Sequence, residues 1–118
     1  MTTSSTQTPK QFSVKYLATA AQEVKDIIRD AKAYYGVSAA QKIREELVTK
    51  TKESLTNNPH FGRPLYEYPE YEKKGIRRYL PHPHYSILYL LNGKTVEIWH
   101  VWDNRRDWTT LFEDKKNR

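Results

Sequence analysis

Arg105, Arg106 and Asp107 stand among tryptophans in WHVWDNRRDW, residues 99–108. The guanidinium groups of Arg105 and Arg106 can each bind a phosphate or a carboxylate through two parallel hydrogen bonds, and Asp107 can orient one of them. The simpler interpretation is an exposed arginine–aspartate pair beside core tryptophans, which would add little stability. We assign Arg105, Arg106 and Asp107 to a surface that binds an anionic target.

A second group of cations leads into a predicted strand and consists of Lys73, Lys74, Arg77 and Arg78. Because successive side chains of a strand point to opposite faces, only one of the two arginines can belong to a given surface. We predict that Arg77 binds the target or a phosphate, and that Arg78 is its solvated neighbour.

Three histidines are candidates for acid–base chemistry, because imidazole titrates near neutral pH. His82 and His84 flank Pro83 in the predicted turn LPHPHY, and His100 lies inside the last predicted strand. The alternative is that they are ordinary turn and sheet residues. His-x-His without a nearby carboxylate is a weak metal-binding pattern, so we predict neither a metal site nor a cofactor.

The first half of the chain predicts one strand followed by a helical hairpin. Residues 12–17, FSVKYL, alternate apolar and polar side chains as a strand does. Apolar residues then recur at helical spacing within residues 20–35 and again within residues 43–55, and Gly36 separates the two helices. Each helix begins near a candidate capping box, Thr19 with Gln22 and Ser38 with Gln41.

The second half predicts a three-stranded antiparallel meander formed by IRRYL, HYSILYLL and KTVEIWHVW. Asn92-Gly93, between the last two strands, is typical of a tight hairpin turn. Strand alternation places one set of side chains of the last strand on a common face, namely Val96, Ile98, His100 and Trp102. The predicted fold is α+β in the order β-α-α-β-β-β, with the N-terminal strand and the helical hairpin packed on an antiparallel sheet.

The 118 residues are expected to form a single domain over residues 12–112. The polar, Ser/Thr-rich residues 1–11 predict a disordered lead-in, and residues 113–118 predict a frayed tail. The excess of 20 Lys and Arg over 14 Asp and Glu favours anionic partners. The absence of cysteine excludes disulfides and thiol catalysis, and the absence of a long apolar run predicts a cytoplasmic protein without membrane contact.

The order of elements and four short stretches resemble the RelE/ParE superfamily of bacterial type II toxins. NPHFGRPL resembles the family's P-x-x-G-x-P-L segment, GIRRYL its G-x-R-x-L strand, HYSILYLL its Y-R-I-x-Y strand, and WHVWDNRRDW its H-x-R-R-D ending. The resemblance covers residues 12–112. It implies a toxin that arrests growth and is held inactive by a cognate antitoxin protein.

The same resemblance leaves the target open, because RelE-like toxins cut mRNA in the ribosome without a metal, whereas ParE-like toxins inhibit DNA gyrase. Metal-free RNA cleavage needs a base, an acid and cations beside the phosphate. Ser86 stands where the RelE-like pattern has a strand arginine, and Trp108 or Phe112 stands where it often has a tyrosine. These departures favour the gyrase-directed action.

Two alternatives to a gyrase-directed toxin stay open. A metal-independent, ribosome-dependent endoribonuclease would use His82, His84 or His100 together with Arg77 and Arg105. A non-toxic binding module of the same fold is the other alternative, and the serine in place of the family's strand arginine is compatible with it.

Overall fold

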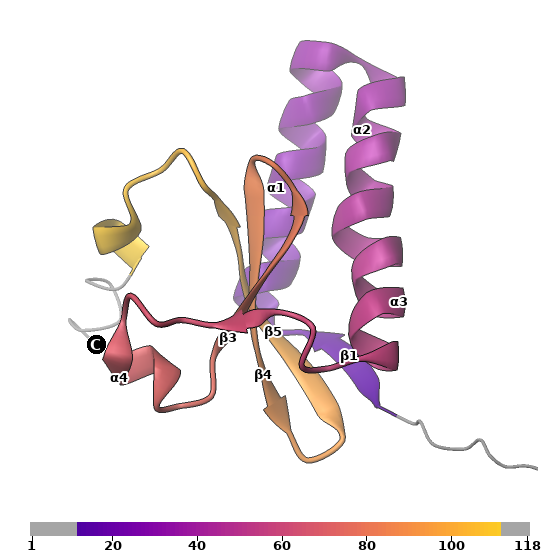
Figure 1. Ribbon diagram of the computed structural model, residues 1–118. Helices are drawn as coiled ribbons and strands as arrows, with labels where there is room; N and C mark the ends of the chain where they lie inside the picture. Colours follow the sequence, from indigo (N-terminus) through magenta and orange to yellow (C-terminus); the bar gives the residue numbers. More distant parts are fainter. Residues whose placement is uncertain (1–11, 112–118) are drawn as a thin grey trace, which may run out of the picture.

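The computed structural model describes residues 12–111 (Figure 1). The predicted lead-in at 1–11, the predicted tail at 113–118 and Phe112 lie outside the described residues. The elements follow one another as β1 (Ser13–Tyr16), α1 (Ala18–Tyr35), α2 (Val37–Arg44), the π-helical turn η2 (Glu45–Thr49), α3 (Lys50–Asn57), β2 (Arg63–Pro64), α4 (Pro69–Glu72), β3 (Arg77–His82), β4 (Tyr85–Asn92) and β5 (Thr95–Asp103).

The strands form one sheet with the order β1-β5-β4-β3-β2, and the predicted α+β architecture is confirmed. The sheet is mixed rather than antiparallel, because β1 pairs in parallel with β5, from Ser13 opposite Thr95 to Tyr16 opposite Ile98. Parallel strands need a long connection, and here the helical hairpin and the rest of the meander supply it. The predicted loop before the meander contains two further short elements, β2 and α4.

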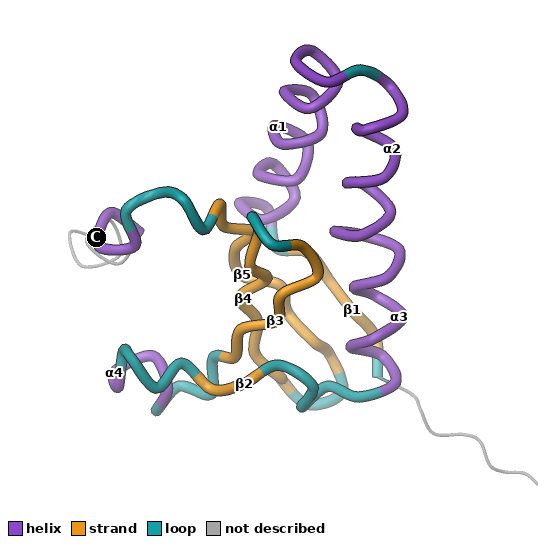
Figure 2. Tube along the Cα trace, turned by 45° about the horizontal axis from the view of Figure 1, so that its top comes forward, coloured by secondary structure: helices purple, strands orange, loops and turns teal. Residues whose placement is uncertain are grey.

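The helices of the hairpin stand side by side, and Gly36 alone joins them (Figure 2). Its φ of 98° lies in the region that favours glycine. The helices begin earlier than predicted, at Ala18 and Val37, so Thr19 and Ser38 lie inside the first turn. Neither helix start has a side-chain capping hydrogen bond, and the two predicted capping boxes are therefore wrong.

The second helix contains the π-helical turn η2, which leaves backbone groups available for other partners. The Thr51 hydroxyl donates to the Glu46 carbonyl at 2.8 Å. The Tyr16 hydroxyl of β1 donates to the Leu47 carbonyl. The first bond lies within the helix and satisfies a carbonyl of the π-helical turn, and the second attaches the middle of the helix to the edge strand of the sheet.

The helices cover one face of the sheet, and the segment around α4 and the C-terminal turn lie on the other side (Figure 1). Ile87 and Tyr89 of β4 belong to the core cluster under the helices, and Leu88 between them belongs to the second cluster, as strand alternation requires. The buried members of the first cluster are Ala20, Val24, Leu47, Leu55, Ile87, Tyr89, Val96, Ile98 and Val101, and those of the second are Leu65, Tyr71, Ile76, Leu88, Trp102 and Leu111.

A β-bulge reverses the predicted alternation within β5. Tyr89 pairs with Ile98 and the preceding Leu88 pairs with His100, so Trp99 is the extra residue. An extra residue on one strand moves the later side chains to the other face. Trp102 therefore lies in the second cluster while Ile98 lies under the helices, and the prediction that these two side chains share a face is wrong.

The fully buried Tyr89 holds the loop between α3 and β2 against the sheet. Its hydroxyl donates to the Pro59 carbonyl at 2.9 Å and accepts the Gly62 amide at 2.8 Å. A Cβ atom on residue 62 would lie 2.7 Å from the Arg78 carbonyl oxygen and 2.9 Å from the Tyr89 ring, so this close approach requires glycine. The loop leads directly into β2, which pairs with the start of β3.

We expect Tyr89→Phe to lower the free energy of unfolding by about 1–3 kcal/mol, because two buried backbone groups lose their partner. Urea unfolding followed by circular dichroism measures this. Tyr34→Phe is the matched control, since Tyr34 is 79% exposed and its substitution should change stability by less than about 0.5 kcal/mol. Equal effects of the two substitutions would contradict the role assigned to the Tyr89 hydroxyl.

Candidate functional site

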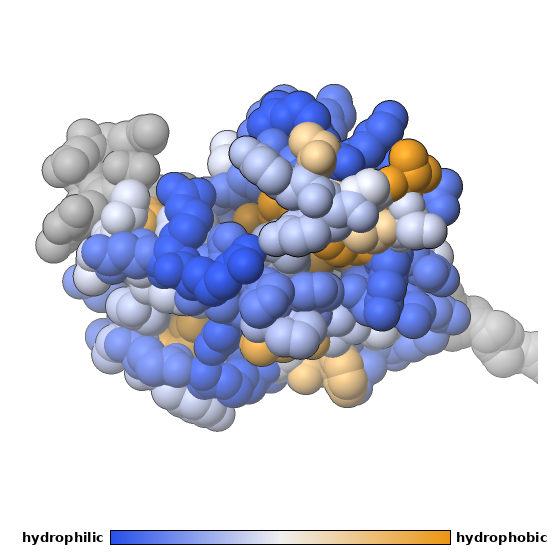
Figure 3. Space-filling view, turned by 90° about the horizontal axis from the view of Figure 1, so that it is seen from above, coloured by the Kyte–Doolittle hydropathy of each residue, from blue (hydrophilic) through white to orange (hydrophobic). Residues whose placement is uncertain are grey.

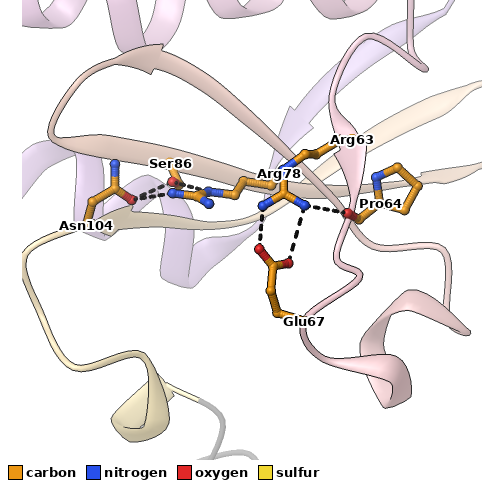
Figure 4. Close-up of polar contacts among 6 residues, drawn as sticks. All are labelled: Arg63, Pro64, Glu67, Arg78, Ser86 and Asn104. Atoms are coloured by element: carbon orange, nitrogen blue, oxygen red, sulfur yellow. Dashed lines mark hydrogen bonds and ion pairs between the residues drawn. The ribbon is translucent and has the colours of Figure 1, made fainter.

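Arg78 lies on the sheet face opposite the helices and connects β3 to β4 and to the loop after β5 (Figure 4). Its Nε donates to the Ser86 hydroxyl at 2.8 Å, and its Nη2 donates to Asn104 Oδ1 at 3.4 Å. The Ser86 hydroxyl donates to the same oxygen of Asn104. Burial lowers the pKa of Arg78, but a guanidinium is so strong a base that it stays charged at neutral pH.

Ser86 occupies the strand position where the RelE-like pattern has an arginine, and its side chain is fully buried. Arg78 is opposite Leu88, two residues further along β4, so Arg78 and Ser86 share a face. The neighbouring strand therefore places a guanidinium beside Ser86. The prediction that Arg78 is merely a solvated neighbour of Arg77 is wrong, because Ser86 and Asn104 hold its side chain.

Asn104 positions the loop that follows β5. Its side-chain amide donates to the Pro83 carbonyl at 3.2 Å, and its backbone amide donates to the His84 carbonyl at 2.7 Å. Together with the bond from Arg78, these contacts attach the loop to the turn between β3 and β4. The loop is thus held from two sides before it reaches Arg105.

Asp103, not Asp107, orients Arg105. The Nε and Nη2 atoms of Arg105 each donate to an Asp103 carboxylate oxygen at 2.9 Å, and this pairing lowers the pKa of Asp103. Asp107 accepts the Thr109 amide at 3.0 Å and the Thr109 hydroxyl at 2.7 Å, so it caps the helical turn at 108–111. The prediction that Asp107 orients an arginine is therefore wrong.

Three arginines of this region each lie over an aromatic ring, an arrangement that favours a cation through the electron-rich ring face. The distances from Cζ to the ring centroid are 5.0 Å for Arg78 over Trp108, 4.5 Å for Arg106 over Trp102 and 6.0 Å for Arg105 over Tyr85. Stacking holds a planar guanidinium while its edge can still donate hydrogen bonds. Tyr85 packs against the cluster under the helices, whereas Trp102 and Trp108 belong to the cluster on the other face, so this set spans both faces of the sheet. We call Arg78, Arg105, Arg106 and these three rings the arginine surface.

Arg77 lies apart from the arginine surface. It is opposite Tyr89 in the sheet and lines a hollow that reaches Leu91, near the end of β4. Arg105 lies over Tyr85, the first residue of β4. The structure therefore does not bring Arg77 together with Arg105 and Arg106.

The three histidines also lie in different surroundings. His82 Nδ1 accepts the His84 amide at 3.0 Å, and His82 Nε2 lies 3.9 Å from Glu46 Oε1. Burial lowers the pKa of His82, so its ring is neutral at pH 7. His84 is exposed, whereas His100 is only 12% exposed and its Nδ1 lies 3.0 Å from Glu23 Oε2.

The residues of the site that sequence reasoning missed are Arg78, Ser86, Asp103 and Asn104. Asp-Asn directly after a predicted strand is typical of a turn, so the sequence did indicate a turn at Asp103 and Asn104. The contact between Arg78 and Ser86 joins two strands, and no local pattern in the sequence indicates it.

The view from above shows a mostly hydrophilic surface on which hydrophobic residues form small separate areas (Figure 3). This face offers a partner charge and hydrogen bonds rather than a broad apolar area. Within residues 12–111, no helix combines the length and the apolar character needed to cross a bilayer.

Comparison with known proteins identifies a family. The family model described as the ParE toxin of the type II toxin–antitoxin system parDE matches residues 14–108. A solved structure described as the chromosomal ParDE TA system from P. aeruginosa is 21% identical and covers 78% of this chain and 95% of its own, with a TM-score of 0.63. At that identity the likeness shows the fold alone. No curated protein matches the chain.

We expect Ser86→Arg to lower the free energy of unfolding by about 3 kcal/mol or more, because it places a second guanidinium beside Arg78 in a filled, partly buried site. Combining it with Arg78→Ser exchanges the two side chains between neighbouring strands and should recover at least half of that loss. A double-mutant cycle of urea unfolding measures the coupling. Additive losses in the double variant would contradict the spatial equivalence of the two positions.

The lowered pKa of His82 predicts a pH dependence of stability. Its ordinary value is 6.5 and the folded value lies below it, so the contribution of the neutral ring to folding is complete above about pH 6.5 and is lost as the pH falls through the folded-state pKa. Stability should therefore fall with acid less steeply in His82→Gln than in the wild type. His60→Gln, at an exposed position, is the control and should keep the wild-type slope.

Proposed function

The chain belongs to the ParE toxin family of type II toxin–antitoxin systems, and on this premise we propose that it is a toxin that arrests growth by inhibiting DNA gyrase. In this proposal a cognate antitoxin neutralises it, and it acts in the cytoplasm, where gyrase is found. It does not cut RNA. The arginine surface is its contact with the target.

The contacts of the histidines carry the proposal of a non-nucleolytic action. A general base must present a ring nitrogen to the hydroxyl that it deprotonates. In His82, Nδ1 accepts the His84 amide and Nε2 faces Glu46, and His100 is largely buried beside Glu23. Two of the three candidate bases are thus engaged within the protein itself.

The surroundings of Arg78 support the same proposal. Its partners Ser86, Asn104 and Trp108 do not exchange protons with a substrate at neutral pH. Glu67 lies in the same small hollow, but its pairing with Arg63 lowers its pKa, so it stays ionised and cannot serve as the acid. Tyr68 also lines this hollow; the two side chains bonded to Arg78, Ser86 and Asn104, can help to orient an anion but supply no acid for the leaving oxygen.

The arginine surface suits an acidic or phosphate-bearing target. Stacked guanidinium groups are pre-oriented, so less conformational entropy is lost when they bind a carboxylate or a phosphate. Asn104 holds the start of the loop that carries Arg105 and Arg106, and Asp107 caps the helical turn that follows it. Both contacts limit the motion of the loop. In this proposal Asp107 does not contact the target but fixes the end of the loop that presents Arg105 and Arg106.

One observation favours the nuclease alternative. The rings of His82 and His84 lie 5.4 Å apart, and the charge of Arg105 is close enough to lower the pKa of His82. In that alternative the exposed His84 would be the base and Arg105 would bind the phosphate.

Two assays with the purified protein separate the functions, namely supercoiling of plasmid DNA by purified gyrase and primer extension on mRNA from a purified translation system. We expect the protein to block supercoiling by gyrase and to leave the mRNA intact. The variant Arg105→Gln with Arg106→Gln should need about tenfold more protein for the same inhibition, because two cations at the contact are lost.

The matched control is Arg29→Gln with Arg44→Gln, which removes the same charge from exposed positions of the helical hairpin. It should inhibit gyrase as the wild type does. New message ends at codon boundaries that require ribosomes would replace our proposal with the nuclease, and Arg105→Gln and His84→Ala would then identify its groups. Equal weakening in both double variants would refute the arginine surface as the contact.

A further inference from the structure

A hollow of about 420 Å³ lies where the start of β3 meets the end of β4. Its apolar wall comes from Pro64, Ile76 and Leu91, and its charged members are Arg77 and Glu72. An apolar wall with a few convergent polar groups is typical of a binding pocket. None of these residues belongs to the arginine surface.

Arg77 lines this hollow and forms no ion pair within the described part of the chain, although Glu72 lines the same hollow. It is partly buried, and its guanidinium makes no hydrogen bond or ion pair with any residue from 12 to 111. The other partly buried arginine, Arg78, has two hydrogen-bond partners, and the exposed Arg63 and Arg105 each bind a carboxylate. A partly desolvated cation gains most from an anion that arrives with a ligand.

The wall also restricts the chemistry of that ligand. Pro64 and Leu91 are partly exposed and suit an aliphatic side chain, while Arg77 suits one carboxylate beside it. Glu72 contributes a negative charge to the same wall and would repel a polyanion such as a nucleic-acid backbone. A protein segment with aliphatic side chains and one carboxylate between them fits these requirements.

We propose that this hollow is the docking pocket for an acidic, aliphatic segment of the antitoxin, whose leucine- or isoleucine-like side chain fills the space while a neighbouring carboxylate pairs with Arg77. This inference rests on the proposed function, because it needs an antitoxin. The net charge of +6 favours an acidic partner. The pocket reaches Leu91 near the end of β4, whereas Arg105 lies over Tyr85 at its start, so the antitoxin has an anchor apart from Arg105.

A pair of short peptides with blocked ends, acetyl-Leu-Glu-Leu-amide and acetyl-Leu-Gln-Leu-amide, probes the pocket in the full-length chain. Titration followed by amide NMR should shift Ile76, Arg77 and Leu91. We expect the Glu peptide to bind about tenfold more tightly than the Gln peptide, since only it offers an anion to the guanidinium. No shift at these residues would overturn the proposal.

Arg77→Gln and Arg44→Gln form a matched pair, because each removes one positive charge. Arg44 is exposed and also makes no hydrogen bond or ion pair with the described residues. Only Arg77→Gln should abolish the preference for the Glu peptide. An equal loss of this preference in both variants would mean that net charge alone attracts the peptide. That result would contradict the proposed pocket.

Growth assays separate this inference from the proposed function. The antitoxin used is one that restores growth to cells producing the wild-type chain. Because Arg77 lies apart from Arg105 and Arg106, this inference replaces the prediction from the sequence that Arg77 binds the target. We expect Arg77→Gln to stay toxic alone but to need about tenfold more antitoxin for neutralisation, whereas Arg44→Gln behaves as the wild type.

Three outcomes would contradict the pocket in different ways. Normal neutralisation of a toxic Arg77→Gln variant would overturn the inference and leave the proposed function intact. Loss of toxicity in a folded Arg77→Gln variant would place Arg77 at the target instead of the antitoxin. A harmless wild-type chain would refute the proposed function and, with it, the antitoxin as the occupant.

Discussion

The hydroxyl of the buried Tyr89 bonds to the Pro59 carbonyl and the Gly62 amide, and these two bonds hold the loop before β2 against β3 and β4. The loop can lie this close to β3 only because residue 62 has no side chain. The chain then enters β2, where Arg63 pairs with Arg78 and Pro64 pairs with Arg77. The side chains of Arg77 and Arg78 point to opposite faces of β3. A single buried tyrosine thus anchors the loop that leads into the partner strand of both arginines.

Arg78 illustrates how a cation is kept in a partly buried position. The cost of desolvating its guanidinium is offset by the Ser86 hydroxyl, the Asn104 amide oxygen and the face of Trp108. The same contacts hold the loop after β5, so binding geometry and fold stability share one set of interactions. Among the described residues Arg77 has no such partners, and this asymmetry distinguishes the two faces of β3.

Much of the fold followed from local patterns in the sequence. The change from alternating to helical spacing predicted the first strand and the helical hairpin, and Asn92-Gly93 predicted the turn between β4 and β5. Strand alternation also predicted that Arg77 and Arg78 belong to different faces. These features depend on neighbouring residues alone, so a single sequence is sufficient to read them. Arg105 and Arg106 likewise follow the last strand directly in the sequence, so their place after it could be predicted from neighbouring residues.

Sequence by itself therefore determined the α+β class, the order of the elements and the residue types available for binding. Only the tertiary structure decided that β1 pairs in parallel with β5, that Trp99 forms a bulge, and which partners hold the arginines. Asp103 replaces Asp107 beside Arg105, and Arg78 reaches across to Ser86. The physical reason is that a side chain's partner is chosen by packing between segments far apart in the chain, and such packing leaves no periodicity or spacing within any one of them.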